Sequence, residues 1–532
     1  ETCLLLSKRL DKKYNKQTIA AKMTDVPGHT RSIIDPMYDA GIRLLHVGIN
    51  SACPLPSVPT FCRWRSPSGN DLLLVYQKDY GEDEVLPDGK TVVSINFTGD
   101  NHGPHSYERV KKIYADLRKR YPQAQLVGAS FNDVARELLL IKKDLPVVTS
   151  EIGDTWIFGY GGAPIRMAKF RAVSRLYSQW LNEGKIKKDS DVALDFAAEL
   201  GLIAEHTQGV DVKTHLRQWD KYDMDKFLKG RSEGVFSMAE ASWKEIDNYI
   251  DSAIAFLPAS LQKEAREVVA EVDKVKLEDN SKMKPMARKR WEQPIAGGMT
   301  LAGLSYQMFD GDDYDDFQNR YLRARYGWAL DDLGKRGLKE SHAVSVTLYA
   351  QTMAQSVRKE KKGTRIITEL RFPENEKVDK RVYPERIQVN CFTTKNGKRS
   401  EVALTIYGKP AVRLPESYWL SFTVPGIESV IAEKMGERVN LMDVVEKGNR
   451  QMHGIDRYVD LITSGETIRI SSKEAFLLNV GEAQGLNYST NYPDKRKGVH
   501  FNLNNNLWGT NFSMWNEGSL TYHFVIETLS RK

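Results

Sequence analysis

Short apolar runs alternate with helical periods over the first 150 residues. Strands are predicted at residues 18–23, 44–49, 126–129 and 145–149, and helices at residues 30–39, 107–121 and 132–141. In the helix at 107–121, Val110, Ile113, Tyr114 and Leu117 recur at the i, i+3, i+4, i+7 spacing of one helical face. This alternation is typical of βαβ units and predicts a mostly parallel sheet or a barrel. Ligands of such folds bind at the carboxyl ends of the strands, so we expect function in the loops that start near Asp25, Gly48, Gly99, Ser130 and Ser150.

The pattern changes twice further along the chain. Residues 165–275 carry long helical periods, at 166–182, 192–202 and 242–256, which predict a helical bundle. A stretch rich in Lys and Glu at 269–290 indicates a solvated helix end and a linker. Beyond residue 345, strands are predicted at 364–372, 386–394, 401–407, 467–471, 476–480 and 523–527, with an Asn-Gly hairpin turn at 396–397. We therefore expect a (β/α) domain at 1–164, a helical bundle at 165–290 and a β-sandwich region at 291–532.

Composition excludes several classes of protein. Of 532 residues, 41% are apolar and 28% charged, which excludes a disordered or fibrous chain. The 77 basic residues exceed the 70 acidic ones by only 7, too small a surplus over this length to indicate nucleic-acid binding. The sequence contains no uncharged apolar run of about 18 residues, so no membrane-spanning helix is predicted. The chain starts at Glu1 with an immediate amphipathic pattern, so we expect it to begin inside a domain, with any targeting signal upstream.

Two polar motifs directly follow predicted strands. Residues 24–30 (Thr-Asp-Val-Pro-Gly-His-Thr) bring the carboxylate of Asp25 and the imidazole of His29 to a pocket mouth, as a nucleophile or a metal ligand requires. The alternative is that Asp25 caps the following helix and His29 is a turn residue. Residues 150–156 (Ser-Glu-Ile-Gly-Asp-Thr-Trp) combine two carboxylates with an aromatic side chain, and Gly-Tyr-Gly-Gly follows at 159–162.

The second motif is typical of a sugar-binding site. Aromatic faces stack on pyranose rings, and glycoside cleavage needs one carboxyl group that attacks or activates water and one that protonates the leaving oxygen. Asp25 and Asp154 are candidates for this pair, and Glu151, Trp156 and Tyr160 for substrate contacts. Helix capping and a buried Trp would explain the same residues.

Three further segments carry weaker signals. His206, in residues 205–211, is a candidate metal ligand beside Asp25, because zinc accepts a neutral imidazole and a carboxylate, although a helix-end histidine explains it as well. Asp100 and His102, in residues 99–105, form a polar loop that can bind sugar hydroxyls or make a simple turn. The acidic run at 310–316 does not have the spacing of a twelve-residue calcium loop, so we interpret it as a solvated acidic turn.

Taken in order, three of these segments resemble the α-mannosidases of glycoside hydrolase family 38. Residues 24–30 are similar to that family's Asp-Pro-Phe-Gly-His-Ser stretch, and residues 154–160 to its Asp-His-Tyr-Trp-x-Gly-Tyr segment. His206 lies where the family's His-His-Asp motif supplies a zinc-binding histidine. Residues 22–30, 151–156 and the closing 508–512 (Trp-Gly-Thr-Asn-Phe) also resemble a related bacterial family, the domain of unknown function 5054.

The resemblance implies a fold and a chemistry. The fold is an irregular, seven-stranded type of (β/α) barrel, a helical bundle and C-terminal β-sandwiches. The activity is that of a retaining, zinc-assisted exo-glycosidase on α-mannosides or a related sugar: Asp25 would be nucleophile and zinc ligand, Asp154 the acid/base, and His206 a zinc ligand. The family's His-x-Asp pair, which supplies two further zinc ligands, does not occur in this sequence. Two alternatives stay open, a metal-dependent deacetylase-like hydrolase that uses Asp25 as base and a non-catalytic carbohydrate-binding protein.

Overall fold

The computed structural model describes residues 1–99, 102–279, 281–509 and 511–529. Contacts divide the chain into two compact units. The first comprises residue 1, residues 3–152 and residues 445–448, and the second comprises residue 2 and residues 153–444 and 449–532. Each unit is described by itself. The predicted boundaries at 164 and 290 stay predictions.

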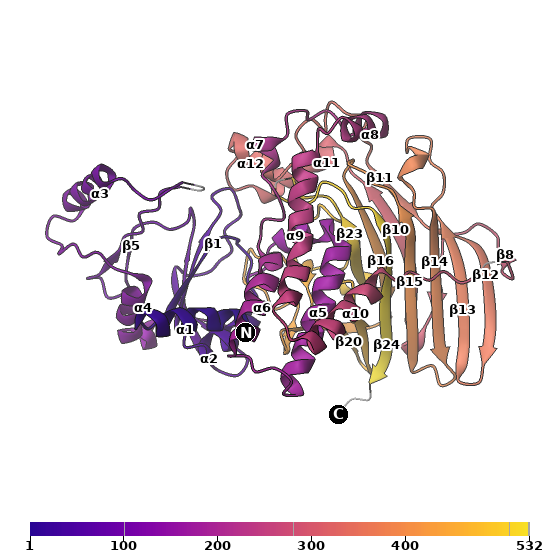
Figure 1. Ribbon diagram of the computed structural model, residues 1–532, viewed down its shortest axis with the longest axis horizontal. Helices are drawn as coiled ribbons and strands as arrows, with labels where there is room; N and C mark the ends of the chain where they lie inside the picture. Colours follow the sequence, from indigo (N-terminus) through magenta and orange to yellow (C-terminus); the bar gives the residue numbers. More distant parts are fainter. Residues whose placement is uncertain (100–101, 280, 510, 530–532) are drawn as a thin grey trace. The chain divides into compact units, whose positions relative to one another are not determined.

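The first unit is built on a mostly parallel sheet (Figure 1). Its strand order is β1-β2-β4-β3-β7, where β1 runs parallel to β2, β2 to β4 and β3 to β7, and β3 is antiparallel to β4. The strands are β1 (Ala20–Asp25), β2 (Leu44–Ile49), β3 (Phe61–Arg65), β4 (Asp71–Gln77) and β7 (Val147–Val148), with a separate pair β5 (Glu84–Val85) and β6 (Val92–Val93). The helices are α1 (Thr2–Tyr14), η1 (Arg31–Ile33), α2 (Ile34–Asp39), α3 (Tyr107–Arg120), α4 (Phe131–Leu140) and η2 (Lys142–Asp144).

The core of this unit lies between the sheet and α4. Ala135 and Leu138 of α4 are buried in one cluster with strand residues that include Leu44, Leu73 and Val75. Apolar spacing along α4 therefore fixes this helix on the sheet. Since β1, β2 and β4 are parallel, their carboxyl ends meet at one edge.

The predicted barrel is not confirmed. Within the described residues the sheet has five strands and ends at β1 and β7, which do not pair with each other. Residues 126–129, predicted as a strand, have no regular secondary structure, and Val127 is 70% exposed. A strand at this position would bury too little apolar surface to offset its ordering.

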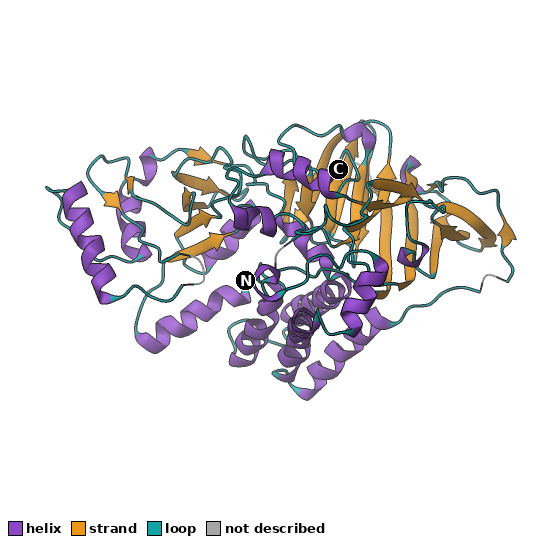
Figure 2. Ribbon diagram, turned by 90° about the horizontal axis from the view of Figure 1, so that it is seen from above, coloured by secondary structure: helices purple, strands orange, loops and turns teal. Residues whose placement is uncertain are grey.

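Helices form one part of the second unit (Figure 2). α6 packs against α9, and α5 against α10. The helices are η3 (Trp156–Gly162), α5 (Pro164–Asn182), α6 (Asp191–Gly201), η4 (Leu202–Ala204), α7 (Val212–His215), α8 (Met224–Ser232), α9 (Ser237–Ala255), α10 (Ala259–Asp273), η5 (Ala296–Gly298), α11 (Gly311–Tyr321), α12 (Gly327–Asp332), η6 (Lys380–Val382) and η7 (Lys495–Lys497).

Two antiparallel sheets form the rest of the second unit. One has the order β11-β10-β16-β23-β22-β19, with β9 beside β10, and the other β18-β17-β20-β21-β24-β15-β14-β13-β12-β8. Phe422 and Phe501 of the first sheet contact Phe524 of the second. The strands are β8 (Lys284–Pro285), β9 (Gln293–Pro294), β10 (Thr300–Met308), β11 (Val346–Tyr349), β12 (Gln351–Glu360), β13 (Gly363–Arg371), β14 (Arg386–Thr394), β15 (Arg399–Lys409), β16 (Glu416–Thr423), β17 (Ile427–Lys434), β18 (Glu437–Asn440), β19 (Met452–Gly454), β20 (Tyr458–Thr463), β21 (Thr467–Ser472), β22 (Leu477–Val480), β23 (Val499–Asn505) and β24 (Gly518–Leu529).

The helical region and the strand region of the second unit share a hydrophobic core, so they form one compact unit. Val212, Phe227 and Phe236 of the helical region are buried in one cluster with Ala411 and Trp515 of the strand region. Across the part of the chain that the structure describes, no helix is long and apolar enough to cross a membrane.

Candidate functional site

Asp25 stands at the edge where the parallel strands of the first unit end. Its Oδ1 accepts hydrogen bonds at 2.8 Å from Nδ2 of Asn50, directly after β2, and at 2.8 Å from the hydroxyl of Tyr80, after β4. The residue has φ 84°, in the left-handed region that non-glycine residues seldom occupy. The three strand ends thus hold one carboxylate in a fixed and strained position, as candidate functional groups often are.

Gly48 permits this arrangement. A Cβ at Gly48 would lie 2.6 Å from the backbone carbonyl carbon of Tyr80, closer than any side chain tolerates. The turn at 78–81 therefore passes directly over β2, and Nζ of Lys22 donates a hydrogen bond to the Tyr80 carbonyl at 3.1 Å. This close approach brings the Tyr80 side chain to Asp25.

His29 is held by the chain itself. Its Nε2 lies 3.1 Å from the carbonyl oxygen of Val26, so Nε2 carries the proton and donates. Its backbone pairs with that of Ile152 in both directions, at 2.8 and 3.1 Å. Burial lowers the pKa of the imidazole to about 4, so His29 is neutral at physiological pH.

The Glu151 carboxylate caps η1. Oε1 accepts hydrogen bonds from the backbone N–H of Arg31 at 2.7 Å and from the hydroxyl of Thr30 at 3.1 Å, and the residue is 3% exposed. A carboxylate at a helix start satisfies backbone donors that have no partner in the helix. A contact of Glu151 with substrate stays a prediction.

The predicted polar loop is described only in part. Asp100 lies outside the described residues. His102 is exposed, and its ring lies against the backbone of Gly99. Both remain predicted substrate contacts.

Asp154, in the second unit, is the buried carboxyl group of the predicted pair. It is 7% exposed, and Oδ1 accepts hydrogen bonds from the backbone N–H groups of Thr155 at 2.6 Å and Trp156 at 3.1 Å. The hydroxyl of Tyr321, at the end of α11, lies 3.0 Å from Oδ1 and 3.2 Å from Oδ2. Burial raises the pKa of Asp154 to about 6, against these hydrogen bonds, which lower it. A carboxyl group with this pKa can hold a proton near neutral pH and donate it.

Tyr321 could not be found from the sequence, because it lies 167 positions from Asp154. The acidic run that precedes it is the first turn of α11, not a solvated turn. Asp310 accepts hydrogen bonds from the backbone N–H groups of Asp312 and Asp313 and caps the helix. The recognisable signal was the capping box, an Asp followed three residues later by a second carboxylate.

Aromatic side chains gather beside Asp154. The ring of Trp156 lies 6.2 Å from that of His206 and 5.9 Å from that of Trp508. Tyr160 donates from its hydroxyl to the carbonyl oxygens of Ala204 and Glu205, at 2.8 and 2.9 Å, and thereby fixes the segment that carries His206. The second unit thus brings four predicted site residues together: Asp154, Trp156, Tyr160 and His206.

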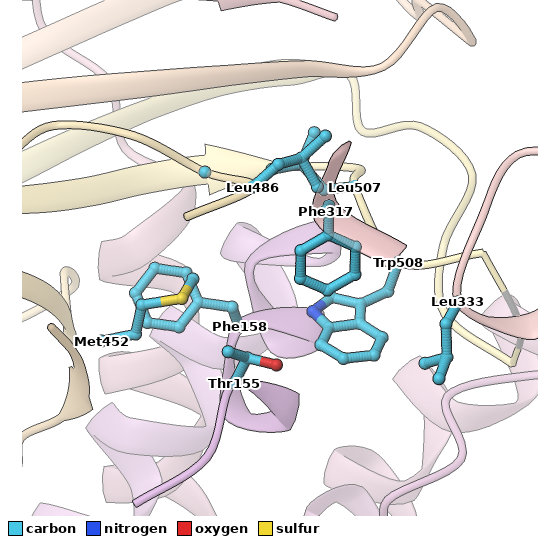
Figure 3. A pocket seen from close by; sticks show the side chains of 9 residues that line it. Thr155, Phe158, Phe317, Leu333, Met452, Leu486, Leu507 and Trp508 are labelled. Atoms are coloured by element: carbon cyan, nitrogen blue, oxygen red, sulfur yellow. The ribbon is translucent and has the colours of Figure 1, made fainter. Parts of the chain in front are cut away.

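A small apolar cavity lies behind this group (Figure 3). It has a volume of about 10 Å³, room for one water molecule, and its walls include Thr155, Phe317 and Trp508. The hydroxyl of Thr155 points into the space toward Trp508. Nε1 of Trp156 is buried and has no hydrogen-bond partner among the described residues. This indole N–H, two residues from Asp154, is therefore open to a ligand or a water.

The glycine-rich stretch after Trp156 serves packing. A Cβ at Gly159 would lie 2.4 Å from the ring of Phe512, and one at Gly161 would lie 2.2 Å from the side-chain nitrogen of Asn505. The glycines let η3 lie directly on β23 and the C-terminal loop.

Zinc binding by the predicted ligands is not confirmed. Asp25 and His206 belong to different units, and Nδ1 of His206 lies 2.8 Å from the carboxylate of Glu205. Among described residues, no group of three or more His, Cys, Asp or Glu side chains could hold a metal ion. Zinc therefore stays an expectation from the family resemblance, and no step proposed for this chain depends on it.

A roomier groove of about 380 Å³ lies between α5, α9 and residues 513–517. Its buried cation, Arg166, pairs with Asp247 at 2.5 Å, and Lys169 pairs with Asp273 at 2.8 Å. The two cations named are thus paired within the chain, and the predicted site residues do not line the groove.

Comparison with known proteins supports the resemblance seen in the sequence. Residues 161–293, most of the helical region, match the family described as domain of unknown function (DUF5054), which confirms that recognition over this range. The structure of an α-mannosidase from Enterococcus faecalis V583 is similar, with a TM-score of 0.52 and 8% identity, covering 100% of this chain and 76% of that one. A protein of glycosyl hydrolase family 38 from Enterococcus faecalis has a TM-score of 0.44 and 10% identity, covering 100% and 75%. No curated protein sequence matches the chain.

At these identities the likeness shows the fold alone. The fold, with a mixed α/β part, helices and large antiparallel sheets, is similar to that of the Enterococcus faecalis α-mannosidase structure.

Proposed function

We propose that the protein is a retaining exo-glycosidase of the α-mannosidase type. The observation that carries the proposal is the buried Asp154, whose pKa is raised to about 6, beside aromatic rings that suit a sugar face. The fold shared with an α-mannosidase supports the same class of substrate.

The reaction needs one carboxyl group that donates a proton and a second that acts as the nucleophile. Asp154 would donate its proton to the departing glycosidic oxygen and later take a proton from water. Asp25, held by the amide of Asn50 and the hydroxyl of Tyr80, would attack the anomeric carbon and form the glycosyl-enzyme ester. Water would then cleave this ester, so that the product keeps the configuration of the substrate.

Substrate contacts are assigned by position. Trp156 would stack on the sugar, and Nε1 of its indole would donate to a hydroxyl group. His29, Asp100, His102, Glu151 and Tyr160 are proposed to line the substrate path.

The leaving group provides a sharp test of these roles. We expect the chain to release nitrophenol from an α-mannoside within a panel of α- and β-glycosides. Asp25→Asn should abolish cleavage of every substrate. Asp154→Asn should reduce cleavage of an unactivated disaccharide by about 10²–10⁴-fold and that of a nitrophenyl glycoside far less, because nitrophenolate departs without a proton.

Asp39→Asn is the matched control, since Asp39 is an exposed aspartate of the first unit. A wild-type protein that cleaves nothing in the panel but binds the sugars, with binding kept in Asp25→Asn and Asp154→Asn, would contradict the proposal. The protein would then be a non-catalytic carbohydrate-binding protein.

A further inference from the structure

Two cations in the second unit lie close together without an ion-pair partner among the described residues, Arg413, which is buried, and Lys335, which is half-buried. Arg413, between β15 and β16, is 2% exposed. Nη1 donates to the carbonyl oxygen of Trp219 at 3.3 Å, whereas Nε has no hydrogen-bond partner among the described residues. The guanidinium lies 4.1 Å from the centre of the Tyr222 ring and 5.2 Å from that of Phe236.

Lys335, three residues after α12, is the second cation. Nζ donates to the carbonyl oxygen of Trp508 at 2.8 Å. The cations on either side of it are paired, Arg336 with Asp331 at 3.5 Å and Lys339 with Asp315. Among described residues, no carboxylate forms an ion pair with Lys335 or Arg413. Burial and then the charge of Arg413 lower the pKa of Lys335 to about 7.

Both side chains line one small pocket. Its other walls include the aromatic rings of Trp219 and Tyr222, and its volume is about 10 Å³. That is room for a single atom-sized occupant and excludes phosphate, sulfate or a nucleotide. The acidic residues that act on this region, Asp220 on Arg413 and Asp331 and Glu340 on Tyr222, do so from beyond ion-pair distance.

We infer that this pocket binds a monatomic anion of the halide class, such as chloride, between Nζ of Lys335 and Nε of Arg413. A buried cation without a partner is costly, and the cost is removed when an opposite charge binds beside it. Two cationic residues lining a pocket of one-atom size, with aromatic walls and no ion-paired carboxylate, suit a weakly hydrated anion better than a neutral water.

The anion would also steady part of the candidate sugar site. Lys335 holds the backbone of Trp508, and the ring of Trp508 contacts that of Trp156 beside Asp154. Binding at the pocket therefore stabilises the 507–509 segment whether or not the chain cleaves glycosides.

Bromide tests the inference directly. Crystals of the full chain grown in bromide should show an anomalous peak between Lys335 Nζ and Arg413 Nε. In solution, bromide should stabilise the folded chain more than gluconate does at equal ionic strength. Above the dissociation constant, each tenfold rise in bromide concentration should lower the unfolding equilibrium constant by up to an additional factor of ten relative to gluconate.

Lys335→Met should remove most of this bromide-specific gain, and Lys339→Met, an exposed lysine on the same segment, should keep it. Lys335→Met keeps Arg413 in place, which makes it a safer variant than one that removes the buried guanidinium. A map without the peak, together with equal slopes in bromide and gluconate, would overturn the inference and leave a water molecule in the pocket.

Discussion

The Asp154 carboxyl group combines burial with hydrogen bonds that favour its charged form. Burial dominates, so its pKa in the folded chain, about 6, lies above the ordinary value of 3.8. A group whose pKa is raised on folding contributes stability that is fully present below the unfolded pKa and is lost as the pH rises through the folded pKa. The stability contributed by protonated Asp154 is therefore lost between about pH 4 and slightly above pH 6.

Asp154→Asn makes this contribution measurable. The asparagine oxygen can still accept from the backbone of Thr155 and Trp156, but the group no longer titrates. Between pH 4 and pH 7 the unfolding free energy of wild type should fall by about 3 kcal/mol relative to the variant, from roughly two pKa units. Urea unfolding at a series of pH values checks this, and a difference that stays constant with pH would show that Asp154 titrates normally.

Tyr321→Phe should raise the pKa of Asp154 further. The tyrosine hydroxyl donates to the carboxylate and so favours the charged form, and its removal is worth about 0.5–1.5 kcal/mol, or up to about one pKa unit. The midpoint of the pH-dependent step should move upward by that amount. Tyr314→Phe is the matched control, because Tyr314 lies on the same helix and bonds the carbonyl of Leu507 at 2.6 Å instead. Equal midpoints in the two variants would contradict the role given to Tyr321.

Residues 24–30 and 150–156 could be selected from the sequence as candidate site segments, because each follows a predicted strand and joins carboxylates to glycine and an aromatic or imidazole group. Their roles stay predictions. Asn50, Tyr80 and Tyr321 could not be predicted, because their contacts to the two aspartates depend on strand order and helix packing.

Among the elements, β2 and β14 have the predicted boundaries, since each is a run of apolar or alternating residues between clear breaks. The Asn-Gly turn between β14 and β15 is also confirmed, with Gly397 at φ 66°. β4 was missed, although residues 72–76 form an uninterrupted apolar run of the kind that fills a buried strand. The strand predicted at 126–129 was wrong. The sequence shows a short apolar run there, but it does not show whether a neighbouring strand is available to pair with it.

Gly48→Ala tests how the strand ends hold Asp25. The added Cβ would meet the backbone of Tyr80 at 2.6 Å, so the turn at 78–81 must move and draw the Tyr80 hydroxyl away from Asp25. We expect a loss of about 1–3 kcal/mol of stability, as for other overpacked sites. Urea unfolding measures it, with Gly103→Ala as control, because a Cβ there meets nothing within 4 Å. Equal stability of the two variants would show that the turn is not held against β2.

At the scale of the whole molecule, pattern and resemblance correctly indicated a mixed α/β fold with helices and large antiparallel sheets, and the fold is similar to that of an α-mannosidase structure. The barrel is not confirmed, and the sequence could not distinguish it from an open sheet, because the pattern of the first 150 residues is the same for both. The predicted β-sandwich and the domain boundaries depend on packing between distant segments, and sequence period does not carry that information.

The stereochemistry of the product tests the retaining mechanism proposed for Asp25 and Asp154. A retaining enzyme must release the α-anomer of the sugar first from an α-glycoside. Proton NMR of the anomeric signal during the first minutes of hydrolysis should show this anomer before mutarotation. Initial release of the β-anomer would mean that Asp25 activates water instead of attacking the sugar.

The central claim, that Asp25 is the nucleophile of a glycosidase, is tested most directly by trapping. A 2-deoxy-2-fluoro or 5-fluoro mannosyl fluoride should form a stable ester with the full chain, and mass spectrometry of the digested protein should place the added sugar on the peptide that contains Asp25. The adduct should not form in Asp25→Asn and should form in Asp39→Asn. A sugar attached to another carboxylate, or turnover without any adduct, would contradict the account.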